Sequence, residues 1–292
     1  MRRFLPLLIL LLGAWAYASA PARGKPGEKI VVITNVNIVE VETGAVRTRL
    51  AVVIKKGRIT AIAKRAIIEE NPQIVIVNGE GKYLIPGLWD MRIRLDQGTG
   101  AERAKNVTVP LLLANGVTGV RDAGGDPAAL KELRRQIEQG EVPGPRMVMA
   151  ATPDERVLVV HDLAEARAAV GALHQRPAAA GVVAGTDSPP GVAPGFALHR
   201  ELELLVEAGL TPLQALQTAT INPVRSLGKE KELGQVEVDK MADLVLLDGD
   251  PTQDIRNLDK IAGVVAAGRY YSRRELDAML AQAQAAADQD QQ

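Results

Sequence analysis

The sequence contains no cysteine and only three histidines, and aromatic residues make up 3% of its 292 residues. Without cysteine the chain can form neither disulfides nor thiolate metal sites, and it has no thiol nucleophile. Any metal site built from imidazoles is limited to His161, His174 and His199. Because aromatic rings are so scarce, the core must consist mainly of Val, Ile, Leu and Ala.

The sequence also lacks an excess of charge of either sign, because 35 Lys and Arg residues balance 35 Asp and Glu residues. This balance argues against a broad phosphate-binding face, so we expect no nucleic acid among the partners. Beyond residue 20, no stretch approaches the roughly 18 consecutive apolar residues that a membrane-spanning helix needs. The composition is instead typical of a globular protein.

The first twenty residues have the layout of a secretory signal peptide. Arg2 and Arg3 precede an apolar run over 5–12, and Ala18-Ser19-Ala20 is a small-residue cleavage site. The alternative is an uncleaved membrane anchor, which the cleavage site disfavours. We therefore expect the protein to be exported, periplasmic or secreted, and to meet the membrane only through the signal peptide. Residues 21–28 are typical of a loose linker.

The remaining sequence changes from β to α/β and back to β. Residues 29–85 contain short β-branched runs separated by turns such as 55–57, which predicts an antiparallel β unit, and residues 235–271 resume this pattern. Between them, residues 86–234 alternate apolar runs with helical stretches, as in a parallel sheet built from βα units. We predict an α/β protein with a composite β-sandwich domain formed by both chain ends, and a C-terminal helix and frayed tail over 272–292.

Several local signals refine this division. Residues 181–188 and 235–239 read as strands because they are apolar or alternating. Asp126 and the pair Thr211 and Gln214 are signals for the starts of two helices.

Five segments follow one another along the chain in a recognisable order. They are LIPGLWD (84–90), GVTGVRDAGG (116–125), GTD (185–187), ELELLVEAGLTPLQALQTATINPVRSLG (201–228) and ADLVLLDGDP (242–251). Together they resemble the amidohydrolase superfamily, especially its imidazolonepropionase-like and Xaa-Pro dipeptidase-like members. The resemblance implies a TIM-type (β/α) barrel that holds divalent metal, zinc above all. It also implies hydrolysis of carbon–nitrogen bonds in cyclic amides or dipeptides by a metal-activated water.

The sequence departs from the family at the first barrel strand, where the family has D-x-H-x-H. Strand alternation would point both imidazoles at one ion. Here the segment reads Asp90-Met91-Arg92-Ile93-Arg94, and no H-x-H occurs anywhere in the chain. Arginine stays protonated and offers no lone pair, so Arg92 and Arg94 cannot bind the metal.

The second departure is length. Residues 86–234 are far fewer than the roughly 250 of a typical eight-unit barrel, and the missing part falls between 156 and 181. We therefore predict a truncated or incomplete barrel. Because open sheet edges tend to pair with other chains, a homo-oligomer is expected.

The resemblance also implies a set of site residues. Asp187, at the end of the last barrel strand, is expected to act as catalytic residue and metal ligand, and His161 is the candidate second ligand. Without a metal, Asp187 would pair with Arg92 or Arg94 instead. Thr186 and His199 are expected to shape the site.

Two hypotheses about function remain. The first is a metal-dependent hydrolase that acts on small amides or dipeptides, with activity impaired by the missing ligands. The second is a non-catalytic family remnant that binds a ligand or partner.

Overall fold

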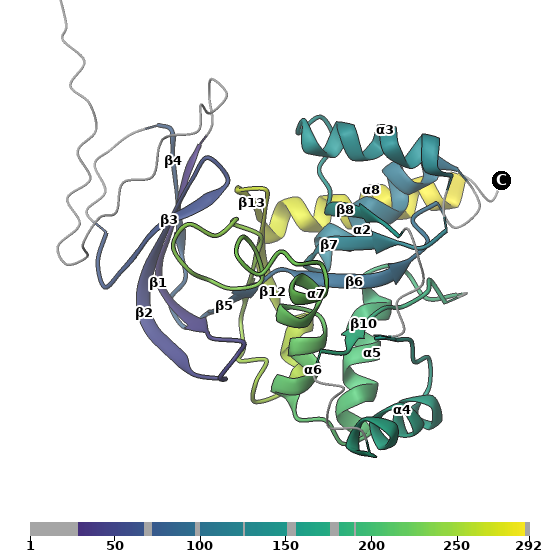
Figure 1. Ribbon diagram of the computed structural model, residues 1–292. Helices are drawn as coiled ribbons and strands as arrows, with labels where there is room; N and C mark the ends of the chain where they lie inside the picture. Colours follow the sequence, from purple (N-terminus) through teal and green to yellow (C-terminus); the bar gives the residue numbers. More distant parts are fainter. Residues whose placement is uncertain are drawn as a thin grey trace, which may run out of the picture.

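The computed structural model describes residues 29–66, 72–96, 100–124, 126–150, 156–175, 181–189 and 191–289. The predicted signal peptide (1–20) and linker (21–28) lie outside these residues. In Figure 1 a curved sheet occupies the left of the molecule and a layered α/β part lies to its right.

An eight-stranded sheet combines strands from both ends of the described chain. Its hydrogen-bonded order is β13-β12-β11-β5-β1-β2-β3, with β4 also paired to β1. The strands are β1 (Ile30–Val39), β2 (Val46–Lys55), β3 (Arg58–Ala63), β4 (Ile74–Asn78), β5 (Tyr83–Pro86), β11 (Leu244–Leu247), β12 (Ile261–Ala266) and β13 (Arg269–Ser272). The antiparallel pairing of β5 with β11 joins the early strands to the late ones.

The turns and crossovers of this sheet explain its strand directions. Lys56 and Gly57 both have positive φ, 52° and 71°, which suits the tight hairpin between β2 and β3. The prediction of a purely antiparallel unit is wrong, because β4 and β5 both run parallel to β1. The predicted strand over 235–239 is also wrong: these residues form a loop, and its backbone bonds at Asp239 and Lys240 cap the start of β3.

A second, three-stranded sheet is parallel, as the strand–helix alternation predicts. It consists of β6 (Leu88–Ile93), β7 (Val117–Asp122) and β8 (Arg146–Met149), in that order. The crossover from β6 to β7 contains α1 (Ala101–Arg103), a π-helical segment (Ala104–Thr108) and α2 (Val109–Ala114). Helix α3 (Pro127–Glu138) crosses from β7 to β8 and begins as predicted, with the Asp126 side chain accepting a hydrogen bond from the Ala128 amide.

A short parallel pair stands beside β6. It is formed by β9 (Val157–Leu158) and β10 (Val183–Ala184), which α4 (Leu163–Gln175) connects. Strand β10 is shorter than the predicted 181–188. Its end approaches β6 so closely that a Cβ on Gly185 would lie 2.6 Å from the Arg92 amide nitrogen, so only glycine fits there.

The last helices complete the α/β part. They are α5 (Phe196–Glu207), α6 (Pro212–Thr218), α7 (Ile221–Ser226), a short 3-10 turn (Ile255–Asp259) and α8 (Arg273–Gln289). The capping box predicted for Thr211 and Gln214 is confirmed at the start of α6. In Figure 1, α3 lies above β6 and β7, whereas α4, α5 and α6 lie below them.

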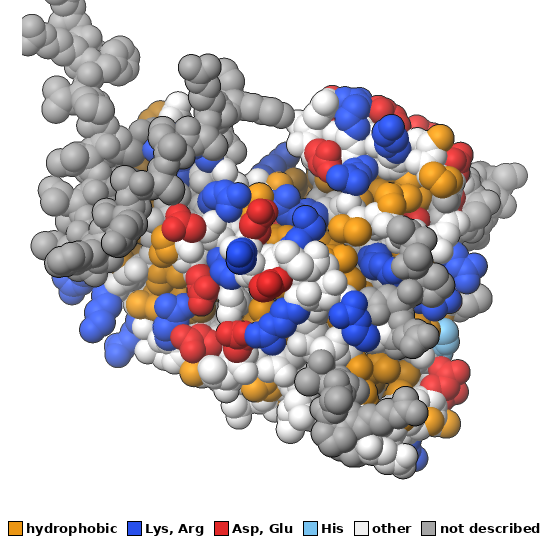
Figure 2. All heavy atoms as spheres, viewed as in Figure 1, with side chains coloured by type: hydrophobic (Ala, Val, Ile, Leu, Met, Phe, Trp, Pro, Cys, Tyr) orange, Lys and Arg blue, Asp and Glu red, His pale blue; other side chains and the backbone are white. Residues whose placement is uncertain are grey.

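One hydrophobic core runs through the α/β part and into the large sheet. Leu88, Ile93 and Leu112 are fully buried there together with Ile85 of β5 and Val264 of β12. The face in Figure 2 carries Lys and Arg side chains interspersed with Asp and Glu. Within the described residues, no helix is long and apolar enough to span a membrane.

Candidate functional site

Asp187 lies between two guanidinium groups at the carboxyl ends of β6 and β10. Its Oδ2 is 3.4 Å from Nη2 of Arg92, and its Oδ1 accepts a hydrogen bond of 3.2 Å from Nε of Arg94. The Asp187 amide also donates to the Arg92 carbonyl at 2.6 Å. The structure thus contains the ion pair that the sequence predicts, with both arginines taking part.

A buried carboxylate lies next to this cluster and holds it in place through hydrogen bonds. Asp90, on β6, is completely buried and accepts hydrogen bonds from the Thr186 amide (3.0 Å), the Thr186 hydroxyl (2.7 Å) and the Arg92 amide (3.2 Å). Burial raises its pKa to about 6; these hydrogen bonds oppose the rise and the nearby Asp187 adds to it. Thr186 therefore shapes the site by tying the loop that carries Asp187 to β6.

Glu201, on α5, is a second buried carboxyl group in this region. Its Oε1 accepts a long hydrogen bond of 3.4 Å from the Gly185 amide, and its Oε2 has no partner in the described structure. Burial, and then the nearby Asp90, raises the pKa of Glu201 well above its usual value of 4.5. Because Asp90 accepts three hydrogen bonds and Glu201 only one, we assign the negative charge to Asp90 and a retained proton to Glu201.

Neither buried carboxyl group was predicted from the sequence as a site residue. Asp90 was visible as the first residue of the altered D-x-H-x-H segment. Glu201 lies three residues after Leu198 and four before Leu205, on the apolar stripe of α5, where a charged residue is unusual. Its position on that stripe was the available signal.

His161 lies next to this site but faces the protein backbone. Its Nε2 is 3.1 Å from the carbonyl oxygen of Thr186, and its Nδ1 is 3.7 Å from a carboxylate oxygen of Glu165. Since a carbonyl oxygen only accepts, Nε2 carries the hydrogen in this contact.

A cavity of about 350 Å³ opens between the end of β10 and helix α5. Its lining is mainly apolar and includes Val160, Ala197 and Leu204, while His161 and Glu201 supply polar groups. A mainly apolar cavity with a few polar groups is the usual form of a small-molecule site.

His199 lies elsewhere. Its Nδ1 is 2.8 Å from Asp259 and its Nε2 is 2.9 Å from the carbonyl oxygen of Asn115, so both ring nitrogens are engaged between α5, the 3-10 turn and the end of α2. The hydrogen bond from His199 lowers the pKa of Asp259. These contacts hold elements together, and a role in shaping the site stays a prediction. The side chain of His174 lies outside the described residues.

Comparison with known proteins gives consistent matches. The model of the amidohydrolase family matches residues 160–270. An imidazolonepropionase of Geobacillus sp. strain WCH70 is 32% identical over 117 residues, which are 40% of this chain and 25% of that protein. An adenine deaminase of Roseobacter denitrificans is 38% identical over 72 residues, 25% of this chain and 11% of that protein. The chain thus spans a quarter or less of the curated relatives it matches here.

Solved structures agree on the fold. A Xaa-Pro dipeptidase with bound methionine has a TM-score of 0.64 at 18% identity, covering 84% of this chain and 100% of that one. Phenylurea hydrolase B has a TM-score of 0.69 at 17% identity, covering 86% and 98%.

The matched segments and the fold both support the resemblance to the amidohydrolase superfamily. The resemblance seen in the sequence is therefore confirmed, as is the mixed α/β fold related to the superfamily's TIM barrels. The superfamily generally uses a divalent metal ion.

The residues at the metal position predicted from the sequence, Arg92, Arg94 and Asp187, do not fit a divalent cation. Arg92 and Arg94 place two positive charges there, and their ion pairs occupy Asp187. The Nε2 of His161 carries a hydrogen and faces the Thr186 carbonyl oxygen, so this nitrogen offers no lone pair to a metal ion beside Asp187. Among the described residues, no group of three or more His, Asp or Glu side chains is arranged to hold a metal.

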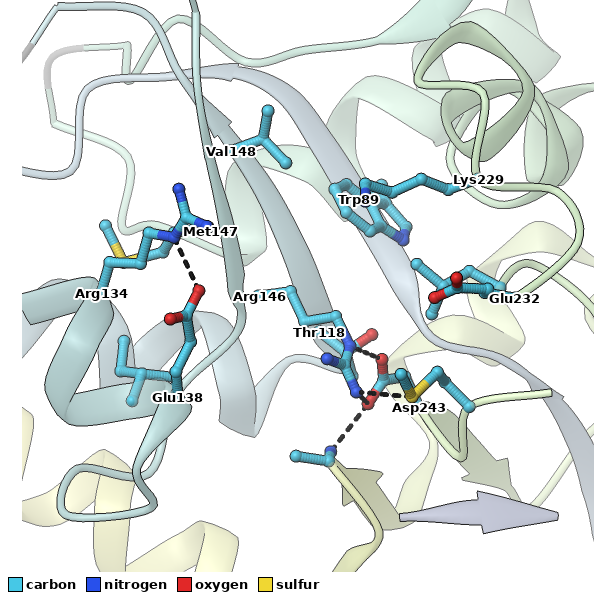
Figure 3. A pocket seen from close by; sticks show the side chains of 15 residues that line it. Trp89, Thr118, Arg134, Glu138, Arg146, Met147, Val148, Lys229, Glu232 and Asp243 are labelled. Carbon is cyan, nitrogen blue, oxygen red and sulfur yellow. Dashed lines mark hydrogen bonds and ion pairs between the residues drawn. The ribbon is translucent and has the colours of Figure 1, made fainter. Parts of the chain in front are cut away.

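Another cavity, of about 380 Å³, lies at the opposite ends of the strands (Figure 3). Trp89 and Thr118 line it from the amino-terminal ends of β6 and β7, and Arg146 pairs there with Asp243. Asp243 also accepts a 2.7 Å hydrogen bond from the Ala267 amide, so the pair links β8 to the large sheet. Active sites of barrel enzymes lie at the carboxyl ends of the strands, and this second cavity is therefore not our candidate site.

Proposed function

We propose that this protein keeps the fold and the ligand cavity of a carbon–nitrogen hydrolase but has lost most or all of the hydrolytic activity. In this proposal it binds a small molecule at the carboxyl ends of β6 and β10 without turning it over. The observation that carries the proposal is the double ion pair of Asp187 with Arg92 and Arg94. The two ion pairs occupy the carboxylate that an active hydrolase of this kind would need for metal binding and proton transfer.

The cavity beside Glu201 supports the binding half of the proposal. It adjoins Thr186, which directly precedes Asp187, and its volume of about 350 Å³ lies within the range of small-molecule sites. Because Glu201 retains its proton, the lining of the cavity carries one negative charge fewer than the sequence suggests.

A hydrolysis assay tests the catalytic half. The purified protein is incubated with Xaa-Pro dipeptides and with cyclic amides, with and without added zinc. We expect no turnover above the level of the Asp187→Ala variant. Zinc-dependent turnover that disappears in Asp187→Ala would establish the alternative, a weak hydrolase with metal at Asp187 and His161.

Restoring the family's residues tests the assignment of β6. The double variant Arg92→His and Arg94→His would present two imidazoles on one face of β6. We expect weak zinc binding and no full turnover, because the described residues include no group of three or more His, Asp or Glu side chains arranged to complete a metal site. Stoichiometric zinc with turnover in this variant would contradict the account.

We further propose that residues 86–234 are an incomplete barrel inserted between the two halves of a composite β domain, 29–85 and 235–271. The three parallel strands β6–β8 and the separate pair β9–β10 support this proposal. An open edge at β8 would favour a homo-oligomer. Analytical ultracentrifugation tests this point, and a monomer at all concentrations would contradict it.

Export is also proposed, on the sequence of residues 1–20. Intact mass measurement of protein recovered from the periplasm or medium should show a chain that begins near Pro21. A chain that retains Met1 in the membrane fraction would support the anchor instead.

A further inference from the structure

Arg92, on β6, and Arg94, directly after it, form a fixed cationic surface feature. Their side chains are 45% and 55% exposed for Arg92 and Arg94, whereas that of Asp187 is only 20% exposed. Both therefore present guanidinium groups to solvent while sharing a single, mostly covered carboxylate. We refer to Arg92, Arg94 and Asp187 as the arginine clamp.

Hydrogen bonds to the neighbouring loop hold the clamp in place. The Asp187 amide donates to the Arg92 carbonyl, and the Arg94 amide donates to the Ser188 hydroxyl oxygen at 3.0 Å. The same hydroxyl donates to the Arg94 carbonyl at 3.3 Å. Asp187 and Ser188 adopt positive φ values of 49° and 52°, a conformation that non-glycine residues rarely take and that often marks functional sites.

The clamp has unused hydrogen-bonding capacity. Each guanidinium has five N–H donors, but with the described residues the Arg94 side chain makes one hydrogen bond, to Asp187, and the Arg92 side chain makes a looser ion pair at 3.4 Å. Two positive charges face one negative charge, so the exposed part of the clamp carries a net positive charge. Planar guanidinium groups match the oxygens of carboxylates and phosphates.

We propose that the arginine clamp binds the oxyanion group of a small ligand, a carboxylate or a phosphate, at the position where relatives hold their metal. Asp187 acts as an internal competitor that occupies the guanidinium groups until the ligand arrives. This inference rests on the proposed loss of the metal site and adds the chemical class of the ligand.

If Asp187 competes with the ligand for the guanidinium groups, removing its charge should strengthen anion binding. Inorganic phosphate and succinate are titrated separately into the protein and followed by NMR chemical shifts at low ionic strength. Asp187→Asn removes the competing charge at nearly constant size, so we expect it to tighten anion binding about tenfold. A catalytic or metal-binding Asp187 would give no such gain.

Arg92→Gln and Arg94→Gln should each weaken binding severalfold, and the double variant should abolish it. Asp254→Asn is the matched control: Asp254 pairs with Arg256 far from the clamp in the sequence, and this substitution should leave anion affinity unchanged. Circular dichroism verifies that each variant is folded. If Asp187→Asn does not fold, loss of binding in the folded double arginine variant still tests the inference.

Several results would overturn the inference: no saturable binding of either anion, or affinity that does not rise in folded Asp187→Asn, or affinity that survives in the double arginine variant. Binding of only one of the two anions supports it and identifies the ligand class. Failure here is distinguishable from failure of the proposed function, because metal content and turnover are measured separately.

Discussion

The buried carboxyl group of Glu201 leads to a quantitative prediction about stability. Glu201 is 1% exposed, and Glu201→Gln preserves its shape while removing the ionisable proton. The weak hydrogen bond from Gly185 is the single contact that favours its charged form. The folded protein therefore keeps this side chain neutral at neutral pH, whereas the unfolded chain ionises it.

The effect of this retained proton on the free energy of unfolding follows from the linkage between proton binding and folding. The pKa of Glu201 is raised on folding, so the folded state binds more protons than the unfolded state above pH 4.5. The free energy of unfolding then falls by about 1.4 kcal/mol for each pH unit between 4.5 and the raised pKa. Glu201→Gln should recover most of the stability lost in this way at neutral pH.

Measurements between pH 6 and pH 8 separate the effect of Glu201 on the free energy of unfolding from that of Asp90. The raised pKa of Asp90, about 6, also makes the free energy of unfolding fall as the pH rises, but mainly below pH 6. Urea unfolding at pH 6, 7 and 8 should show falling stability in the wild type and a flatter profile in Glu201→Gln. Glu207→Gln, on the same helix but half exposed, is the control and should change stability by less than about 0.5 kcal/mol.

The opposite outcome is a Glu201→Gln variant that is no more stable than the wild type at pH 7, with the same slope in both profiles. That result would mean that Glu201 is ionised inside the fold, with a partner that compensates its charge.

Three further substitutions have expected costs. Thr186→Val removes the 2.7 Å hydrogen bond to Asp90 and should cost about 2 kcal/mol in urea unfolding; an unchanged midpoint would show that this bond does not hold the loop. His199→Phe leaves the buried carbonyl of Asn115 without its donor and should lower stability by about 1–3 kcal/mol, which thermal unfolding measures. Thr211→Ala removes the cap of α6 and should cost about 1 kcal/mol, and a cost near zero would contradict the cap's role.

The local parts of the fold could be predicted from the sequence. Capping signals at Asp126 and Thr211 and the turn at Gly57 act within a few residues, so their outcome depends little on the rest of the chain. The pairing of Asp187 with Arg92 and Arg94 was also predictable, because opposite charges at the ends of neighbouring strands meet when the strands align.

Long-range features were harder to predict. The parallel direction of β4 and β5 depends on a crossover that carries no strong local signal. Residues 235–239 alternate like a strand but form a loop beside the start of β3. The neutral state of Glu201 depends on burial by α5 and β10 together, which a pattern along one helix only suggests.

Metal content after exposure to zinc shows whether the arginine clamp stands in place of a metal site. Purified protein is incubated with excess zinc, desalted and analysed by inductively coupled plasma mass spectrometry, with Asp187→Ala as the reference. We predict far less than one zinc per chain and no difference between the two proteins. One zinc per chain that is lost in Asp187→Ala would contradict the claim.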